Sequence, residues 1–378
     1  MRWSYRVARI AGIDISIHIT FLLIVLLFAV QWGSIHGIVG AFFGVALVLL
    51  LFLCVLLHEL GHSLAAQRLG IGVQQIMLLP LGGVALLSRT VTRPLHELLI
   101  ALAGPLVNVL LAILIGAVLA ATGNLLLLGS SAMVQGLDVD LTWQTLLLWL
   151  FEANILLVVF NMIPALPLDG GRVLRSVLAM ATDFRRATQI AAVLGQGIAV
   201  ALGLYALLGG NFFLLLIAVF IFLGAGQERS ASQASVMLSS HRVSDAYNKH
   251  ALTLTIGDRV SNVLDYIMTG YQPAFAVLQE SRLLGIITRD DVLELLRTAP
   301  DQANVLDVYV TTVMRREVVR VDVGQTLDDA LQVMGASNVR VVAVFDEAQY
   351  VGLLNRDDLA EAYTVLTFME RLQRVPTA

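Results

Sequence analysis

The chain has 378 residues, of which 58% are hydrophobic and only 14% are charged, and its formal net charge is −4. This composition and a mean hydropathy of +0.82 exclude a wholly soluble globular protein and indicate an integral membrane protein with a soluble part attached. The single cysteine, Cys54, excludes an internal disulfide framework, and no basic patch of the size needed for nucleic-acid binding is present.

Uncharged apolar runs predict about six membrane-spanning helices. The first run is as long as a span and has no small-residue cleavage site, so no cleavable signal peptide is expected. Gly209, Gly210 and Asn211 divide the last uncharged stretch into two passes. In chain order, the expected spans are residues 15–35, 40–66, 97–122, 144–166, 187–208 and 211–226.

The positions of the arginines predict how these spans are oriented across the membrane. All ten arginines of residues 1–226 precede the first span or follow the second and the fourth, while the alternate loops carry none. By the positive-inside rule, we expect a multi-pass protein of the cell membrane with both termini in the cytoplasm. The ten residues are Arg2, Arg6, Arg9, Arg68, Arg89, Arg93, Arg172, Arg175, Arg185 and Arg186.

A His-Glu-Leu-Gly-His motif ends the second span. Residues four apart share one face of a helix, so His58 and His62 can bind one Zn²⁺ while Glu59 lies beside it as a general base for peptide hydrolysis. This spacing also occurs by chance in soluble helices. Ionisable groups at bilayer depth are costly and usually mark function, so the motif predicts a zinc site inside the membrane, near its cytoplasmic face.

The third zinc ligand is expected in residues 161–171, where two prolines and two glycines break the fourth span. The turn would aim the carboxylate of Asp169 inward, although this residue could instead only cap the next helix. The amide of Asn161 could hold a substrate carbonyl or the developing oxyanion, or it could make a packing hydrogen bond. For Asn108 and Asn154 we expect interhelical hydrogen bonds, and for Cys54 a packed thiol.

Residues 73–88 are too short to cross the membrane and return as helices. They suit a re-entrant β-hairpin that turns near residues 80–83, and one of its strands could pair with an unwound substrate segment. The alternative is a re-entrant loop without strands.

The C-terminal part contains an internal repeat with an offset of 67 residues. Residues 283–291 align without a gap to residues 350–358, and each unit is predicted to form a helix, two short strands and a helix. Two such units are expected to stack on each other. The predicted domains are a membrane domain at 1–226, a linker at 227–242, a first repeat at 243–300, and a second repeat with a C-terminal helix at 301–378.

The two membrane motifs, HELGH and N-x-x-P-x-x-P-L-D-G-G, together resemble the site-2 protease family of intramembrane zinc metalloproteases. The resemblance covers residues 1–226 and includes the segments 81–84 and 103–108. It implies that His58, His62 and Asp169 bind zinc and that Glu59 is the general base. It also implies membrane-spanning substrates, such as anti-sigma factors or precursor proteins, that are cut within or near a transmembrane helix.

The repeat is similar to a pair of cystathionine-β-synthase (CBS) modules. This resemblance implies an adenosine-containing ligand, such as an adenine nucleotide, in the cleft between the modules, with Thr288 and Asp291 as contacts. In the second repeat Asp358 matches the pattern, but Asn355 departs from it. A pair that serves only to form a homodimer is the alternative.

The expected protein is therefore a polytopic α-helical membrane protein with a re-entrant hairpin and a soluble α/β CBS-pair domain. Its expected function is zinc endopeptidase, with the CBS pair as a regulatory or dimerising module. The alternatives are a CBS-regulated membrane transporter and a catalytically inactive homologue that binds substrates without cutting them. The joint presence of HELGH and LDGG argues against a transporter, and the intact set of His58, Glu59, His62 and Asp169 argues against an inactive homologue.

Overall fold

The computed structural model describes residues 4–80, 82–87, 91, 93–123, 140–270, 272–298 and 305–373. It divides into two compact units between Ser232 and Gln233. Arg2, Leu81 and Arg89, on which the sequence predictions partly rest, lie outside the described residues, as does most of the loop expected between the third and fourth spans.

In the part of the chain that the structure describes, six helices make up most of the first unit. Five of them, among the residues described, are long and apolar enough to cross a membrane, and α5 is shorter. The helices are α1 (Phe21–Arg68), α2 (Pro94–Ala121), α4 (Trp143–Asn161), α5 (Asp169–Ala181), α6 (Phe184–Leu208) and α7 (Phe212–Ser239).

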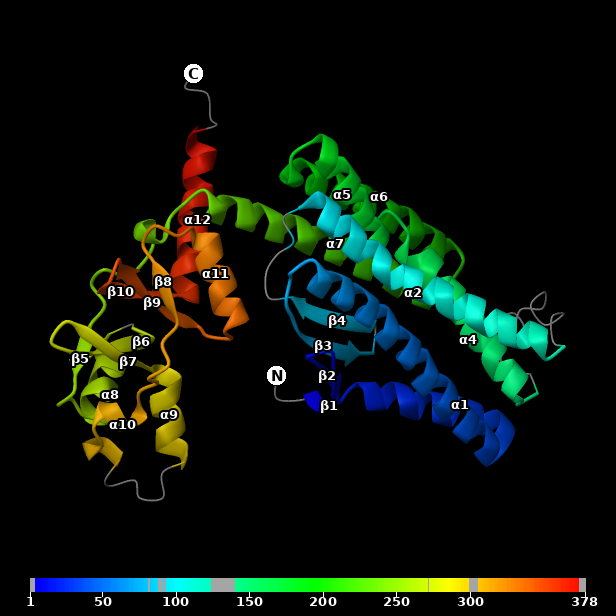
Figure 1. Ribbon diagram of the computed structural model, residues 1–378, viewed down its shortest axis with the longest axis horizontal. Helices are drawn as coiled ribbons and strands as arrows, with labels where there is room; N and C mark the ends of the chain where they lie inside the picture. The colour runs from blue at the N-terminus through cyan, green and yellow to red at the C-terminus, as the bar shows by residue number, and fades with distance from the viewer. Residues whose placement is uncertain are drawn as a thin grey trace. The chain divides into compact units, whose positions relative to one another are not determined.

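Helix α1 is a helical hairpin, because its chain reverses at Gly37, where φ is +63° and ψ is −151° (Figure 1). The two arms pack so closely that a Cβ at Gly40 would lie 2.3 Å from the carbonyl oxygen of Trp32. Further along, the rings of Phe21 and Phe52 are 4.6 Å apart between centroids. Small residues at the crossing allow this approach, so α1 supplies two of the expected apolar runs.

The first expected span is wrong at its beginning. Residues 15–18, which we assigned to it, belong to strand β2, and the helix starts only at Phe21. The segment alternates apolar and polar residues, which favours a strand with one buried face, and Ile13 and Ile15 are buried.

Strand β2 belongs to a four-stranded sheet of order β1-β2-β3-β4. Strands β2 and β3 are parallel, and the other two pairs are antiparallel. The hairpin expected at residues 73–88 is present as β3 and β4, and β4 is an edge strand that packs near α1. The strands are β1 (Ser4–Ile10), β2 (Ile13–His18), β3 (Val73–Leu79) and β4 (Gly82–Leu87).

The fourth helix, α4, ends at Asn161 rather than at the expected residue 166, because the proline-rich turn follows immediately. In that turn, a Cβ at Gly170 would lie 2.3 Å from the carbonyl oxygen of Met162, so only glycine fits. The tight turn makes Asp169 the first residue of α5. At the other end of the unit, α7 continues past Gly226 through most of the segment expected to be a linker.

The second unit contains two similar halves, each with a helix, two antiparallel strands and a helix in the expected order. Each half also has a short strand, β5 or β8, that joins its sheet in parallel. The sheet orders are β5-β6-β7 and β10-β9-β8. The elements are β5 (Thr253–Thr255), α8 (Val260–Thr269), β6 (Ala274–Gln279), β7 (Arg282–Thr288), α9 (Arg289–Thr298), α10 (Val310–Val313), β8 (Arg320–Asp322), α11 (Leu327–Ala336), β9 (Val341–Asp346), β10 (Gln349–Asn355) and α12 (Arg356–Gln373), with 3₁₀ turns at Val243–Asp245 and Val305–Asp307.

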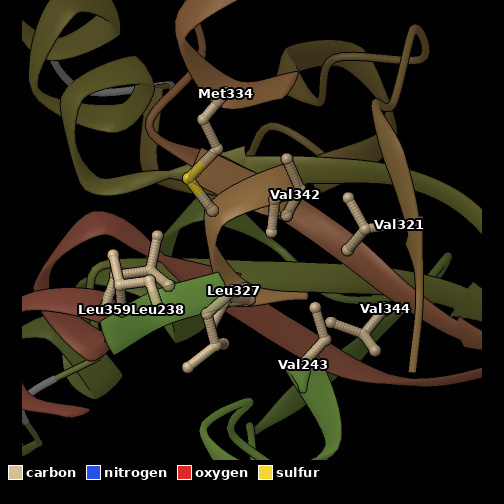
Figure 2. Close-up of a cluster of buried hydrophobic side chains, with 10 residues drawn as sticks. Leu238, Val243, Val321, Leu327, Met334, Val342, Val344 and Leu359 are labelled. Atoms are coloured by element: carbon tan, nitrogen blue, oxygen red, sulfur yellow. The ribbon is translucent and has the colours of Figure 1, made fainter. Parts of the chain in front are cut away.

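The two halves exchange the segments that precede them. Val243, which begins the first repeat, lies in the core of the second half beside Leu327 and Val344 (Figure 2). Val310, the equivalent residue 67 positions later, lies in the core of the first half. The exchange and a shared cluster between the two sheets make the halves one folded unit.

Candidate metal centre

Two helices bring three buried donor side chains together. The Nε2 atoms of His58 and His62, on the second arm of α1, are 3.0 Å apart. Oδ2 of Asp169, on α5, lies 3.2 Å from each of them. The ligand atoms of all three residues lie within 4.8 Å of one another, and this donor set is typical of a catalytic zinc site.

The remaining nitrogens of both imidazoles are held by α2. Nδ1 of His62 donates to the carbonyl oxygen of Ile100 at 2.7 Å, and Nδ1 of His58 donates to Oδ1 of Asn108 at 2.9 Å. Since Nδ1 donates, each Nε2 carries a lone pair that points toward Asp169. Three acceptor atoms that face one another repel unless a cation lies between them, so the site fits a metal ion.

Asn108 makes the interhelical hydrogen bond that the sequence predicts, but its partner is His58 of the motif. Its side chain therefore orients a donor of the metal centre as well as joining two helices. Asn154 follows the expectation in part, since its amide nitrogen donates to the carbonyl oxygen of Leu150 in its own helix and lies 3.4 Å from Sγ of Cys54 on α1. The role of Asn108 could be suspected from sequence only after α2 is known to cross α1 at the motif.

The two helices cross at small residues. A Cβ at Gly61 would lie 2.8 Å from the carbonyl oxygen of Ala103, and one at Gly104 would lie 2.1 Å from Nε2 of His62. Any side chain at Gly104 would therefore fill the space that the imidazole of His62 occupies. The Ala103-Gly104-Pro105 segment thus positions the metal centre sterically.

A cavity of about 540 Å³ opens at the metal centre. Glu59 and Asn161 line it beside the three donors, so the structure brings together all five site residues predicted in the membrane part. The cavity wall consists largely of apolar residues from α1, α4, α7 and strand β4.

Arg172 also lines this cavity, although its place in the sequence predicts only that it lies on the cytoplasmic side. It follows Asp169 by three residues on α5 and so lies on the same face of that helix. Its Nε is buried and has no hydrogen-bond partner among the described residues, which marks it as a donor available to a bound molecule.

In the second unit, Thr288 and Asp291 lie together at the start of α9. Both the backbone N–H and the hydroxyl of Thr288 donate to Oδ2 of Asp291, at 2.9 and 2.6 Å. Nε of Arg315 donates to the other carboxylate oxygen at 2.9 Å. Both oxygens of Asp291 therefore have partners within the protein.

Asp358 lies in a different environment. Its Oδ2 accepts the backbone N–H of Asn355 at 2.8 Å, and burial raises the pKa of its carboxyl group. The offset of 67 residues places Asn248 where the first half has Arg315, so Asp358 lacks the cation that pairs with Asp291. The two candidate nucleotide contacts are thus electrostatically unequal.

The chain matches two known families. Residues 46–205 match peptidase family M50, and residues 243–298 and 310–365 match the CBS domain. The chain is 30% identical to the zinc metalloprotease MJ0392 of Methanocaldococcus jannaschii over 373 residues, which cover 99% of this chain and all of that protein. It is 27% identical over 377 residues to the putative zinc metalloprotease sll0528 of Synechocystis, with 94% of each chain covered.

Among solved structures, the site-2 protease from M. jannaschii is 36% identical and covers 60% of this chain and 95% of its own, with a TM-score of 0.43. The match to MJ0392 covers 99% of this chain and therefore extends over both units. The chain therefore belongs to peptidase family M50, the site-2 proteases, and is a membrane zinc metalloprotease that carries a CBS pair.

Proposed function

We propose that the protein is an intramembrane endopeptidase whose single zinc ion is held by His58, His62 and Asp169. The observation that carries this proposal is the convergence of three buried donor atoms, with Glu59 beside them, on a cavity walled by apolar helices. When bound, zinc acts as a Lewis acid that makes water nucleophilic at neutral pH.

Glu59 serves as the general base. Its carboxylate lines the cavity but is not one of the three converging donors, so it is free to accept a proton from the attacking water and pass it to the leaving nitrogen. Asn161 and Arg172 line the same cavity with amide and guanidinium donors. Donors of this kind can stabilise the negative charge that develops on the carbonyl oxygen, and we assign that role to both.

The substrate is a transmembrane protein, in the class of anti-sigma factors or membrane-bound precursors. Its scissile segment must become extended, since the hydrogen bonds of a helix cover its carbonyl groups. Strand β4 is an edge strand, and five of its residues line the cavity, so it can pair with the extended segment. Apolar cavity walls suit the apolar side chains of such a segment.

The membrane domain, residues 1–226, crosses the bilayer six times, counting both arms of α1, with both termini and the CBS pair in the cytoplasm. The hairpin β3–β4 enters the membrane from the cytoplasmic side, and residues 227–242 connect to the repeats at 243–300 and 301–378. Reporter fusions after residues 36, 130 and 210 should be outside, and those after 90, 180 and 240 inside. One reversed position would remove a span or invert the orientation.

The CBS pair regulates cleavage by binding an adenine nucleotide through Thr288 and Asp291, with Asp358 as the contact in the second half. A nucleotide that prefers one arrangement of the protein tenfold shifts its equilibrium by about 1.4 kcal/mol. Cleavage rates should therefore depend on nucleotide in the intact chain, but not in Asp291→Ala or in a chain that ends after residue 232. If the intact chain is indifferent to nucleotide, the pair is a homodimerisation module instead.

The decisive experiment uses purified protein in detergent with single-span substrates. We expect one zinc ion per chain, its loss in His58→Ala, and retained zinc without cleavage in Glu59→Gln. Equal zinc loss in Glu59→Gln would make Glu59 a ligand or a structural residue. Zinc binding without cleavage of any substrate by the unaltered chain would favour the inactive homologue, and membership in a protease family argues against the transporter.

A further inference from the structure

A buried charge cluster lies outside the metal centre and joins four helices. Nε of Arg175, on α5, donates to Oε1 of Glu97 on α2 at 2.9 Å, and its Nη2 contacts the same oxygen. Its Nη1 donates to Oε2 of Glu228 on α7 at 3.0 Å. The guanidinium also lies over the ring of Phe184 on α6, 5.1 Å from its centroid. We call Glu97, Arg175 and Glu228 the clamp.

The α2 end of the clamp belongs to the helix face that orients both histidines. Glu97, Ile100, Gly104 and Asn108 follow one another at intervals of three or four residues, so they lie along one face of α2. All four are buried. Ile100 and Asn108 hold the two imidazoles, and Gly104 leaves room for His62.

The α5 end belongs to the helix that carries the third donor. Asp169 is the first residue of α5, and Arg175 follows it within the same 13-residue helix. Oγ of the next residue, Ser176, lies 3.1 Å from the second oxygen of Glu97 and 2.8 Å from the carbonyl oxygen of Arg172, so its one hydrogen has two acceptors. Both oxygens of Glu97 are therefore in contact with α5, and this double contact fixes the position of α5 along α2.

The clamp contributes more to the relative position of the helices than to the free energy of unfolding. The side chains of Arg175 and Glu97 are 9% and 6% exposed, and the desolvation of such a pair offsets much of its Coulomb attraction. A planar guanidinium does, however, impose direction on each partner. A functional site must be held to within about 0.5 Å of its working geometry, and directed contacts between α5 and α2 limit displacements of that size.

We propose that Arg175 is a positioning residue of the metal centre. Through Glu97 it holds α5, and with it Asp169, in register with the α2 face that orients the histidines. Through Glu228 it ties this arrangement to α7, the helix that continues past Ser232 into the second unit. The inference rests on the proposed zinc ligands.

The test uses the full chain loaded with zinc in detergent. Glu228→Gln removes the charge from the α7 arm and leaves the contacts between Arg175 and Glu97 in place. Arg175→Lys keeps the positive charge but cannot bridge both carboxylates with a planar fork. Asp140→Asn is the matched control, since it removes an exposed carboxylate of the same unit, far along the chain from the clamp and from the three metal donors.

Three quantities are measured for each variant: the rate of zinc loss to a chelator at 25 °C, kcat and KM for cleavage, and the Tm. We expect zinc loss to be several-fold faster in Glu228→Gln and about tenfold faster in Arg175→Lys, with kcat reduced and KM unchanged. Asp140→Asn should match the unaltered protein in all three. If Arg175→Lys does not fold, Glu228→Gln decides the question.

A lower Tm in Glu228→Gln with unchanged zinc loss and unchanged kcat would overturn the proposal, because the clamp would then only stabilise the helix packing. Failure of the underlying zinc site has a different signature. In that case Asp169→Asn would retain zinc as firmly as the unaltered chain.

Discussion

Gly83 on strand β4 lies directly against the side chain of Glu59. A Cβ at Gly83 would lie 2.4 Å from Cγ of Glu59, closer than real Cβ contacts allow, and 3.2 Å from its Oε1, which is tighter than most. Gly83→Ala should therefore displace the carboxylate without touching a zinc donor. Because a displacement of about 1 Å can cost 10²-fold in rate, we expect kcat to fall by about that factor while zinc content stays at one per chain.

The control for Gly83→Ala is Gly197→Ala, since a Cβ at Gly197 meets nothing within 4 Å. Cleavage rate and zinc content measured together distinguish the outcomes. Zinc loss in Gly83→Ala would show that the strand supports the metal centre itself.

Gly104→Ala should have the opposite effect on the metal. The added carbon would lie 2.1 Å from Nε2 of His62, the atom that would bind zinc, and the imidazole could move away only by giving up its hydrogen bond to the carbonyl oxygen of Ile100. We expect zinc content well below one per chain and loss of cleavage. Metal analysis after dialysis measures this, and full zinc occupancy would mean that α2 can move away from α1.

Asn108→Leu should weaken zinc binding by about 10- to 100-fold, because Nδ1 of His58 would lose its acceptor. Asn108→Asp keeps an acceptor at the same place and should restore most of the affinity. Competitive titration against a zinc chelator measures both variants. Equal losses in the two would assign Asn108 to helix packing rather than to the orientation of His58.

The stability of the CBS pair should depend on pH through Asp358. Burial raises the pKa of this carboxyl group in the folded unit, so its contribution is fully present below the unfolded pKa and is lost as pH rises through the folded pKa. Asp358→Asn stays neutral and keeps an acceptor for the N–H of Asn355. In a fragment of residues 233–378, this variant should raise the Tm at pH 7, with a smaller difference at pH 4. A lower Tm at pH 7 would contradict the assignment.

The local parts of the site could be predicted from the sequence. The positions of His58, Glu59 and His62 relative to one another follow from the period of one helix, which any helical context preserves. Prolines and glycines in residues 161–171 end one helix and start the next at Asp169, and this too is a local property. The repeat offset of 67 residues likewise predicts the two similar halves of the CBS unit, because segments of similar sequence form similar helices and strands.

Only the tertiary structure decided which distant residues meet. The apolar run that begins at Ile15 predicts a helix through residues 15–18, but pairing with β3, far along the chain, makes this segment part of strand β2. The contacts of Asn108 with His58, of Gly83 with Glu59 and of Arg175 with Glu97 and Glu228 each join different elements. Periodicity determines which residues share a face, but not which face of another element lies opposite. That choice is made by close packing, to which the whole chain contributes.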